Sequence, residues 1–294
     1  MDNIFSPRIR HELGLWVDAL LCSFSQVLFQ NRRRCGAILL LAITIESPQL
    51  LAGALAGCIA ALTGARISGF DRQRLRAGHY GFNGALIGLG VVALAGLSSA
   101  TLSLIGLFGL LSAPLMEWQL RRFPLPPYTS VFILLGWCAW ALLPTEPALP
   151  MSPTASLPLT LQSVILGLGQ VLFLGTPVAA MLVLLALALG STRDCGWALV
   201  GALTGTLVAG GLSVAAGDLQ QGLYGFNAAL AAVALSLRFG HQPLLILAGG
   251  ALSTLLQPLL AQCGIPPFTA PFVLSCWLIG LMASILQSRR AATS

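Results

Sequence analysis

The chain has 294 residues, of which 56% are hydrophobic and 8% are charged, and its mean hydropathy is +0.87. A soluble domain carries about 25% charged residues, so this chain cannot cover a water-facing surface and is expected to be a membrane protein. Its net charge of +6 comes from Arg alone, because the sequence contains no Lys. The Arg residues lie in short connectors between apolar runs, a pattern that indicates membrane orientation and argues against nucleic-acid binding.

Long uncharged runs such as Val91–Met116 and Gly196–Ala216 reach the roughly 20 residues that a membrane-spanning helix needs. They are continuous and rich in Leu, Ala and Gly, which favours helices over the short alternating segments of a membrane barrel. Each half of the chain is expected to contain six apolar segments. In the first half these are residues 13–29, 35–46, 48–66, 79–97, 99–118 and 126–143.

Three short motifs occur twice in the same order. YGFNGALIG at 80–88 matches YGFNAALAA at 224–232 in six of nine positions, SQVLF at 25–29 pairs with GQVLF at 169–173, and PPYT at 126–129 pairs with PPFT at 266–269. The offsets are 224 − 80 = 144, 170 − 26 = 144 and 269 − 129 = 140. The chain is therefore expected to consist of two homologous repeats, 1–145 and 160–294, joined by an extracytoplasmic linker at 146–159.

The Arg distribution predicts how the repeats are oriented. If five segments of each repeat cross the membrane and one re-enters, every Arg falls on one side, whereas Glu46, Glu146 and Asp218 fall on the other. The positive-inside rule then places both termini in the cytoplasm, and the odd number of crossings inverts the second repeat. Which of the first two segments re-enters stays open. The predicted fold class is an all-α polytopic membrane protein with two inverted repeats, each of five transmembrane helices and one re-entrant pore helix.

Polar side chains recur at equivalent places within the apolar segments. Inverted repeats place a solute site near the membrane midplane, where the two halves meet. Gln26 and Gln170 are candidates for that site, because a buried amide costs several kcal/mol unless it is paired, although a hydrogen bond in helix packing would also explain them. Thr129 and Thr269 follow Pro-Pro, and each hydroxyl either faces the solute or bonds its own helix backbone.

Aromatic and aliphatic side chains accompany these polar residues. A lone Phe is more often a core residue, but four Phe residues form two symmetric pairs beside polar positions. The first pair is Phe29 and Phe173, and the second pair is Phe82 and Phe226. Two Leu residues lie one helical turn after the second Phe pair and share its face, whereas Asn83 and Asn227 are better explained as caps or anchors of the following helix. The candidates that line the path are Phe29, Phe173, Phe82, Phe226, Leu86 and Leu230.

Several kinds of chemistry lack a sequence signature here. No Arg lies inside an apolar segment, and Asp18 is the one carboxylate expected to be buried there. The sequence has no Walker motif, its three His residues lack metal spacing, and its seven Cys residues show no CxxC pair and are expected to be free, buried thiols. We therefore expect no cofactor or metal, and a neutral path suited to a small, neutral, planar, polar solute.

The repeated QVLF, YGFN and PPYT or PPFT motifs resemble those of the urea transporter family, and the resemblance covers essentially the whole chain. It implies a passive, channel-like path for urea through each protomer of a homotrimer, embedded in the lipids of the inner (plasma) membrane. It also implies that Gln26 and Gln170 accept hydrogen bonds from urea at the two ends of a narrow filter. The Phe and Leu residues would form flat slots, and Thr129 and Thr269 would lie at its centre.

This sequence departs from the family pattern in one place and leaves two other function classes to consider. The stretch Gln30–Cys35 is rich in Arg where the family often has Asn-Pro. A channel for other small neutral solutes, such as short amides, ammonia or water, shares the repeat logic. A membrane enzyme would need a nucleophile, base or metal constellation, and none is found in the sequence, so the chain is not expected to be an enzyme.

Overall fold

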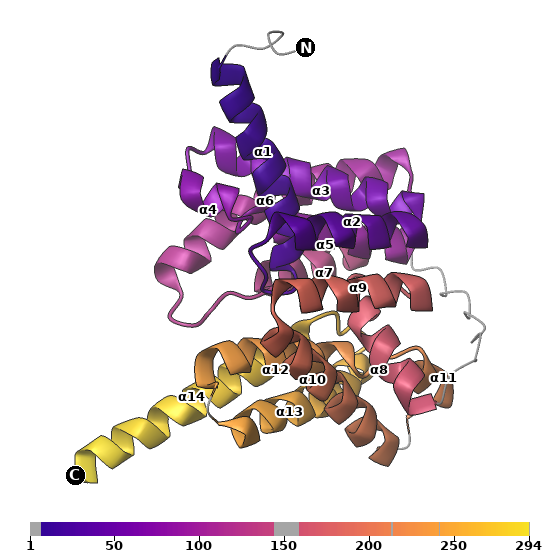
Figure 1. The fold of residues 1–294 in the computed structure, drawn as a ribbon, viewed down its shortest axis with the longest axis vertical. Coiled ribbons are helices and arrows are strands. Elements are labelled where there is room, and N and C mark those ends of the chain that lie inside the picture. Colours follow the sequence, from indigo (N-terminus) through magenta and orange to yellow (C-terminus); the bar gives the residue numbers. More distant parts are fainter. Residues whose placement is uncertain (1–6, 144–158, 213, 241, 294) are drawn as a thin grey trace. The chain divides into compact units, whose positions relative to one another are not determined.

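The computed structural model describes residues 7–143, 159–212, 214–240 and 242–293, and within these ranges the regular structure is helical (Figure 1). The chain groups into two compact units. Unit 1 comprises Met1–Arg122, Leu134–Ala148 and Leu185–Ser191, and unit 2 comprises Phe123–Ile133, Leu149–Leu184 and Thr192–Ser294. Each unit is therefore built mainly from one predicted repeat and includes a segment from the other. Most of the predicted linker, 146–158, lies outside the described residues.

Unit 1 contains the helices of the first predicted repeat. The helices are α1 (Pro7–Gln26), α2 (Arg33–Glu46), α3 (Pro48–Ile67), α4 (Arg72–Arg76), α5 (Gly81–Ala95), α6 (Ser99–Arg122) and most of α7 (Ser130–Leu142). In this unit α3 packs against α5 and α6, and α5 also packs against α6. Helix α1 contacts α2, the short helix α4 and α5, which brings the SQVLF and YGFN motifs to neighbouring elements (Figure 1).

Unit 2 repeats this order of elements. Its helices are α8 (Leu159–Gln170), the first part of α9 (Pro177–Gly190), α10 (Thr192–Gly211), α11 (Ala216–Gln220), α12 (Phe226–Phe239), α13 (Pro243–Gln262) and α14 (Ala270–Thr293). Here α10 packs against α12, α13 and α8, and α12 packs against α13 and α14. The predicted apolar segments of the first half all correspond to helices. The short helices α4 and α11, in the polar connectors before the YGFN motifs, were not predicted.

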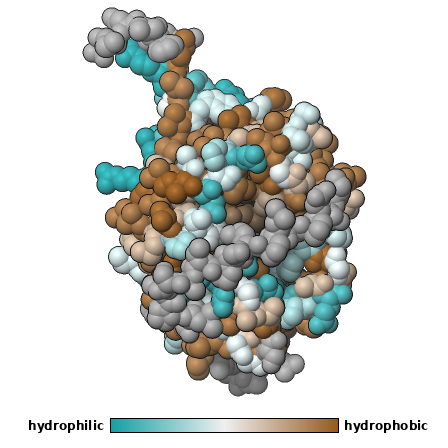
Figure 2. Space-filling model, turned by 90° about the vertical axis from the view of Figure 1, so that its right-hand side faces the viewer, coloured by the Kyte–Doolittle hydropathy of each residue, from teal (hydrophilic) through white to brown (hydrophobic). Residues whose placement is uncertain are grey.

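Three described helices, α3, α6 and α13, are long and apolar enough to cross a membrane, and shorter apolar helices accompany them. Large apolar side chains also stand on the outside of these elements: Leu207 on α10 is 62% exposed and Leu259 on α13 is 56% exposed. Figure 2 shows hydrophobic side chains spread over much of the visible face. A soluble protein would not expose so many large apolar side chains, so this surface fits a lipid environment.

Close packing of α3 against α5 depends on glycine. Gly53 and Gly57 on α3 face Gly84 and Gly88 on α5, each pair spaced by four residues. A Cβ atom added at Gly57 would overlap the carbonyl oxygen of Gly84, and one added at Gly88 would overlap that of Gly53. Such stripes of small residues let helix backbones approach closely in membranes. This contact fixes the YGFN-bearing helix within unit 1.

We predict that Gly57→Ala lowers the stability of the detergent-solubilised protein by about 1–3 kcal/mol, because a methyl group forced into a tight contact strains both helices. The matched control is Gly106→Ala on α6, where an added Cβ meets no atom within 4 Å. That change should be neutral or stabilise by up to about 1 kcal/mol. Thermal unfolding of the two variants gives the comparison, and equal melting temperatures would contradict the packing described here.

Candidate functional site

Two turns with the same backbone conformation follow the helices that carry Gln26 and Gln170. Helix α1 ends at Gln26 and α8 ends at Gln170, and in each turn the N–H of the Phe three residues later donates to the Gln carbonyl, at 3.0 and 3.1 Å. Phe29 has φ 59° and Phe173 has φ 60°, in the left-handed region that non-glycine residues rarely adopt. The Arg-rich sequence after Phe29 therefore leaves this turn unchanged.

The other non-glycine residues with positive φ in the described ranges are Tyr128 and Phe268, at 47° and 45°. They occupy equivalent positions in the PPYT and PPFT motifs. A non-glycine residue in this conformation costs of order 1–3 kcal/mol and persists where the surroundings impose it, often at functional sites. All four positions fall in two of the three repeated motifs, which marks these motifs as the strained part of the backbone.

The two candidate glutamines make the same tertiary hydrogen bond. Gln26 Nε2 donates to the carbonyl oxygen of Ala77, and Gln170 Nε2 donates to that of Gln221, both at 3.1 Å. Ala77 and Gln221 are the C-cap residues that directly follow the short helices α4 and α11. Neither side-chain oxygen accepts a hydrogen bond from any described residue. Each amide is therefore held by its nitrogen while its oxygen stays an available acceptor.

The candidate residues are divided between the two units. Unit 1 holds Gln26, Phe29, Phe82 and Leu86, and unit 2 holds Gln170, Phe173, Phe226, Leu230, Thr129 and Thr269. Phe82 is the second residue of α5 and Phe226 is the first residue of α12, and both Leu side chains are buried. Phe29, Phe173 and Phe226 are partly exposed, like the two glutamines. Each unit thus gathers one QVLF motif and the Phe and Leu of one YGFN motif.

Thr129 and Thr269 meet within unit 2. Their Oγ1 atoms are 2.7 Å apart, and both side chains are buried. The sequence left open whether each hydroxyl bonds its own helix backbone, and the structure shows that they bond each other instead. Because one hydroxyl donates to the other, the accepting Thr keeps its own proton for a further partner. The two hydroxyls therefore form a buried polar contact between the N-terminal ends of α7 and α14.

An aromatic side chain outside the predicted set lies beside these residues. Phe132 is buried, and its ring centroid lies 6.3 Å from that of Phe173 in an edge-to-face arrangement and 5.2 Å from that of Phe268. Edge-to-face contact orients the neighbouring ring, so Phe132 helps to fix the plane of Phe173. Its signal in the sequence is its own repetition, because Phe272 occupies the matching position 140 residues later (272 − 132).

Asn227 anchors the second Thr motif. Its Nδ2 donates to Gln257 Oε1 at 3.0 Å and to the Phe268 carbonyl at 3.1 Å, and its Oδ1 accepts from the Phe272 N–H at 3.3 Å. The structural role expected for this residue is confirmed, although it anchors rather than caps α12, whose N-terminal cap is Gly225. In unit 1 Asn83 is likewise buried, and its Nδ2 lies 3.7 Å from Met116 Sδ.

The expectation that Asp18 is the one buried carboxylate was wrong. Glu117, inside α6, is also buried and forms ion pairs with Arg121 and with Arg74, while the Tyr80 hydroxyl donates to it at 2.7 Å. Hydrogen bonding to Tyr80 is the main cause that raises the pKa of Arg74 above its usual value, and the nearby Glu117 and Asp71 carboxylates add to it, so Arg74 stays a cation. Sequence reasoning missed Glu117 because two of its partners, Arg74 and Tyr80, lie 43 and 37 residues away in the sequence.

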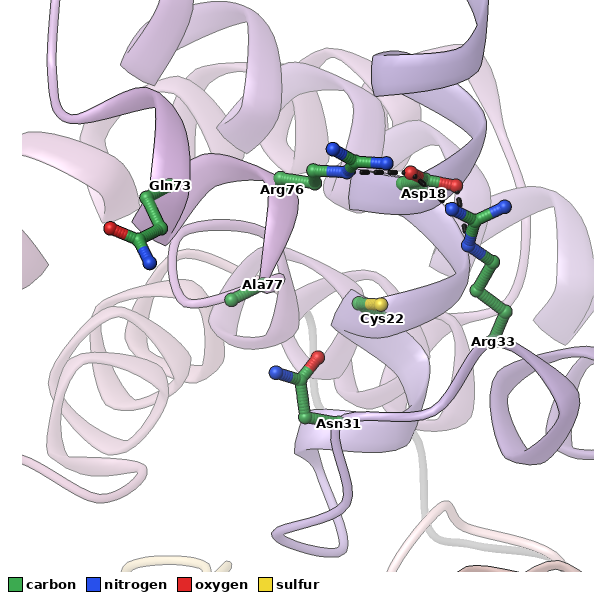
Figure 3. Close-up of a pocket in the computed structure, with 7 residues that line it drawn as sticks. All are labelled: Asp18, Cys22, Asn31, Arg33, Gln73, Arg76 and Ala77. Atoms are coloured by element: carbon green, nitrogen blue, oxygen red, sulfur yellow. Dashed lines mark hydrogen bonds and ion pairs between the residues drawn. The ribbon is translucent and has the colours of Figure 1, made fainter.

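Asp18 itself lies beside a pocket next to Gln26. The pocket has a volume of about 290 Å³. Figure 3 shows the guanidinium groups of Arg33 and Arg76 converging on the Asp18 carboxylate. Ala77, whose carbonyl accepts from Gln26, also lines this pocket. The lining residues are Asp18, Cys22, Asn31, Arg33, Gln73, Arg76 and Ala77. Within the described residues, no three His, Cys, Asp or Glu side chains gather as a metal site would require.

We predict that Asn227→Ala destabilises the protein by about 2–4 kcal/mol, since it removes three hydrogen bonds and leaves buried groups unpaired. The control is Gln242→Ala, an exposed amide whose side chain caps nothing. Thermal unfolding in detergent measures both changes. Equal stability of the two variants would show that Asn227 does not anchor the Thr269 motif.

The chain was compared with known proteins. A family model described as "Urea transporter" matches residues 17–284. The curated protein Urea transporter 1 of Ovis aries is 26% identical over 298 residues, which cover 92% of this chain and 77% of the sheep protein. Urea transporter 1 of Capra hircus gives the same identity and coverage, and that of Rattus norvegicus is 26% identical over 75% of this chain and 62% of its own.

Proposed function

The chain belongs to the urea transporter family, and we propose that it conducts urea passively, as a channel, across the inner (plasma) membrane. Membership makes it a multi-pass membrane transport protein and not an enzyme. The observation that carries the proposal is the matched pair of glutamines, Gln26 and Gln170, each held by its amide nitrogen with its oxygen available. Two such acceptors in one chain suit a solute that is rich in N–H donors.

Urea has four N–H donors in one plane and one carbonyl acceptor, and removing its water without replacement costs several kcal/mol. The Gln26 and Gln170 oxygens would replace that water at the two ends of the filter. The Thr129–Thr269 hydroxyl pair would supply a further polar contact between them. Binding at each point has to stay weak, because a channel site that holds its solute tightly does not conduct.

Shape would supply the selectivity. Phe29, Phe173, Phe82 and Phe226, with Leu86 and Leu230 one turn behind the second pair, would form flat slots that admit urea edge-on. Support comes from the backbone at Phe29 and Phe173, whose matched positive φ angles hold both rings in corresponding positions of each motif. Phe132, packed edge-to-face on Phe173, would keep the plane of that ring.

The proposed assembly is a homotrimer of protomers, each with its own pore, surrounded by membrane lipids. Each protomer would contain two inverted repeats of five transmembrane helices and one re-entrant helix, with both termini in the cytoplasm. The re-entrant elements would be α1 and α8, because each ends in the same left-handed turn within an apolar region. Irregular backbone at membrane depth is tolerated where it is buried in protein or lines a watery path.

We predict that the double variant Gln26→Leu, Thr129→Val slows urea flux by roughly 10- to 30-fold, because two hydrogen-bonding groups worth about 1 kcal/mol each are lost and 1.4 kcal/mol is a factor of ten. Stopped-flow light scattering on proteoliposomes measures the flux. Expression and oligomeric state should be unchanged, because both replacements preserve approximate side-chain size.

The matched control is Gln49→Leu, Thr44→Val, in which both residues are exposed and the Thr hydroxyl bonds the carbonyl of Leu40 in its own helix. This variant should keep wild-type urea flux. If the Gln26 and Thr129 double variant conducts urea as fast as this control, the proposed filter is wrong. If the wild-type protein conducts short amides or ammonia but not urea, it is instead a channel for another small neutral solute.

A further inference from the structure

We propose that Asp18 is a positioning residue for Gln26, and that it acts by clamping Arg33 and Arg76 at the pocket beside that glutamine. We call these three residues the Asp18 clamp. The inference rests on the proposed function, since it assigns a device that adjusts one end of the urea filter. It concerns only unit 1, because the matching positions of the second repeat carry no charge.

The clamp is a buried carboxylate between two largely exposed cations. Arg33 Nε lies 2.6 Å from Asp18 Oδ1 and its Nη2 donates to Oδ2 at 2.7 Å, while Arg76 Nε donates to the same Oδ2 at 2.7 Å. The Asp18 side chain is 3% exposed, against 57% for Arg33 and 58% for Arg76. A buried charge is costly when it loses its partners, so the carboxylate holds both guanidinium groups in place (Figure 3).

The clamp reaches Gln26 through a short chain of contacts. Asp18, Cys22 and Gln26 follow one another at intervals of four residues on α1, so they lie along one face of that helix, toward α4. Arg76 is the last residue of α4, and the carbonyl of the next residue, Ala77, accepts the Gln26 amide. A shift of Arg76 therefore moves the group that orients Gln26.

The clamp also answers a local excess of positive charge. Arg32, Arg33 and Arg34 lie at the beginning of α2, where the positive end of the helix dipole disfavours cations. Without Asp18, the Arg33 and Arg76 guanidinium groups would face each other across the pocket with no anion between them. We expect them to separate, which would pull the end of α4 and the Ala77 carbonyl away from Gln26.

The second repeat reaches the same geometry without charges. At the offset of 144, Gln162 stands for Asp18 (162 − 18), Pro177 for Arg33 (177 − 33) and Gln220 for Arg76 (220 − 76). Gln170 still donates to the Gln221 carbonyl at the same 3.1 Å. The neutral turn of the second repeat needs no counter-charge, whereas the Arg-rich turn of the first does. The clamp is thus a compensation specific to the Gln26 end.

The test combines three variants with two readouts. Asp18→Asn removes the charge, Asp18→Glu keeps it, and Glu12→Gln is the matched control. Glu12 also lies on α1 between two Arg side chains, Arg66 and Arg72, but at 3.6 and 3.5 Å and outside the pocket. The readouts are the concentration dependence of urea flux in proteoliposomes, and the labelling of Cys22 by N-ethylmaleimide, resolved by peptide mass spectrometry.

We expect Asp18→Asn to raise the half-saturating urea concentration roughly fivefold, the factor for one lost hydrogen bond, with Asp18→Glu restoring most of it. Labelling of Cys22, which is buried in the wall of the pocket, should rise several-fold in Asp18→Asn alone. The exposed Cys138 and Cys263 report the reagent's general reactivity. Glu12→Gln should match the wild type in both readouts.

Unchanged Cys22 labelling in Asp18→Asn overturns the clamp, whatever the flux, as does a Glu12→Gln variant that behaves like Asp18→Asn. If the wild type conducts no urea, the proposed function fails, but the labelling still decides the clamp. Increased Cys22 labelling confined to Asp18→Asn then supports it as a device that fixes α4 against α1. If Asp18→Asn does not fold, Asp18→Glu decides, and wild-type values of its half-saturating urea concentration and its Cys22 labelling support the clamp. If Glu12→Gln also fails to fold, the effect is not specific to Asp18 and the clamp is overturned.

Discussion

The hydrogen bond from a glutamine amide nitrogen to the carbonyl that ends a short helix is the constraint on which the site depends. Gln26 makes it with Ala77 and Gln170 makes it with Gln221, at the same 3.1 Å. The bond satisfies the nitrogen and leaves the oxygen as an acceptor. An untethered amide could turn either its N–H donors or its acceptor oxygen toward a solute. The hydrogen bonds to the carbonyls that follow α4 and α11 therefore leave the oxygen as the available group.

Holding these amides requires strain and close packing elsewhere. Each Gln-bearing helix ends in a turn that forces a Phe into the left-handed region, and the Thr motifs do the same to Tyr128 and Phe268. Such conformations persist only when surrounding structure imposes them. In unit 2 the Asn227 hydrogen bonds to the Phe268 carbonyl and the Phe272 N–H supply that support. The strained backbone at Phe268 is therefore held directly by a buried anchor residue, Asn227.

Hydropathy predicted most of the helices, and motif repetition singled out most of the candidate residues. The apolar segments predict the long helices, because period and length are local properties of the chain, and the paired motifs single out both glutamines and both threonines. Tertiary contacts could not be predicted: the bond between Thr129 and Thr269 joins residues 140 apart, and Arg74 and Tyr80, which bond the buried Glu117, lie 43 and 37 residues from it. The short helices α4 and α11 lie in polar connectors whose sequence has no apolar period.

The central claim is that the chain offers urea a passive, selective path. The most direct measurement is stopped-flow light scattering on wild-type proteoliposomes, comparing urea with glycerol and with protein-free vesicles, without any ion gradient. The account predicts fast urea entry that saturates only weakly, with glycerol entry equal to that of bare lipid. Urea entry no faster than through bare lipid, in protein shown to be folded, would contradict it.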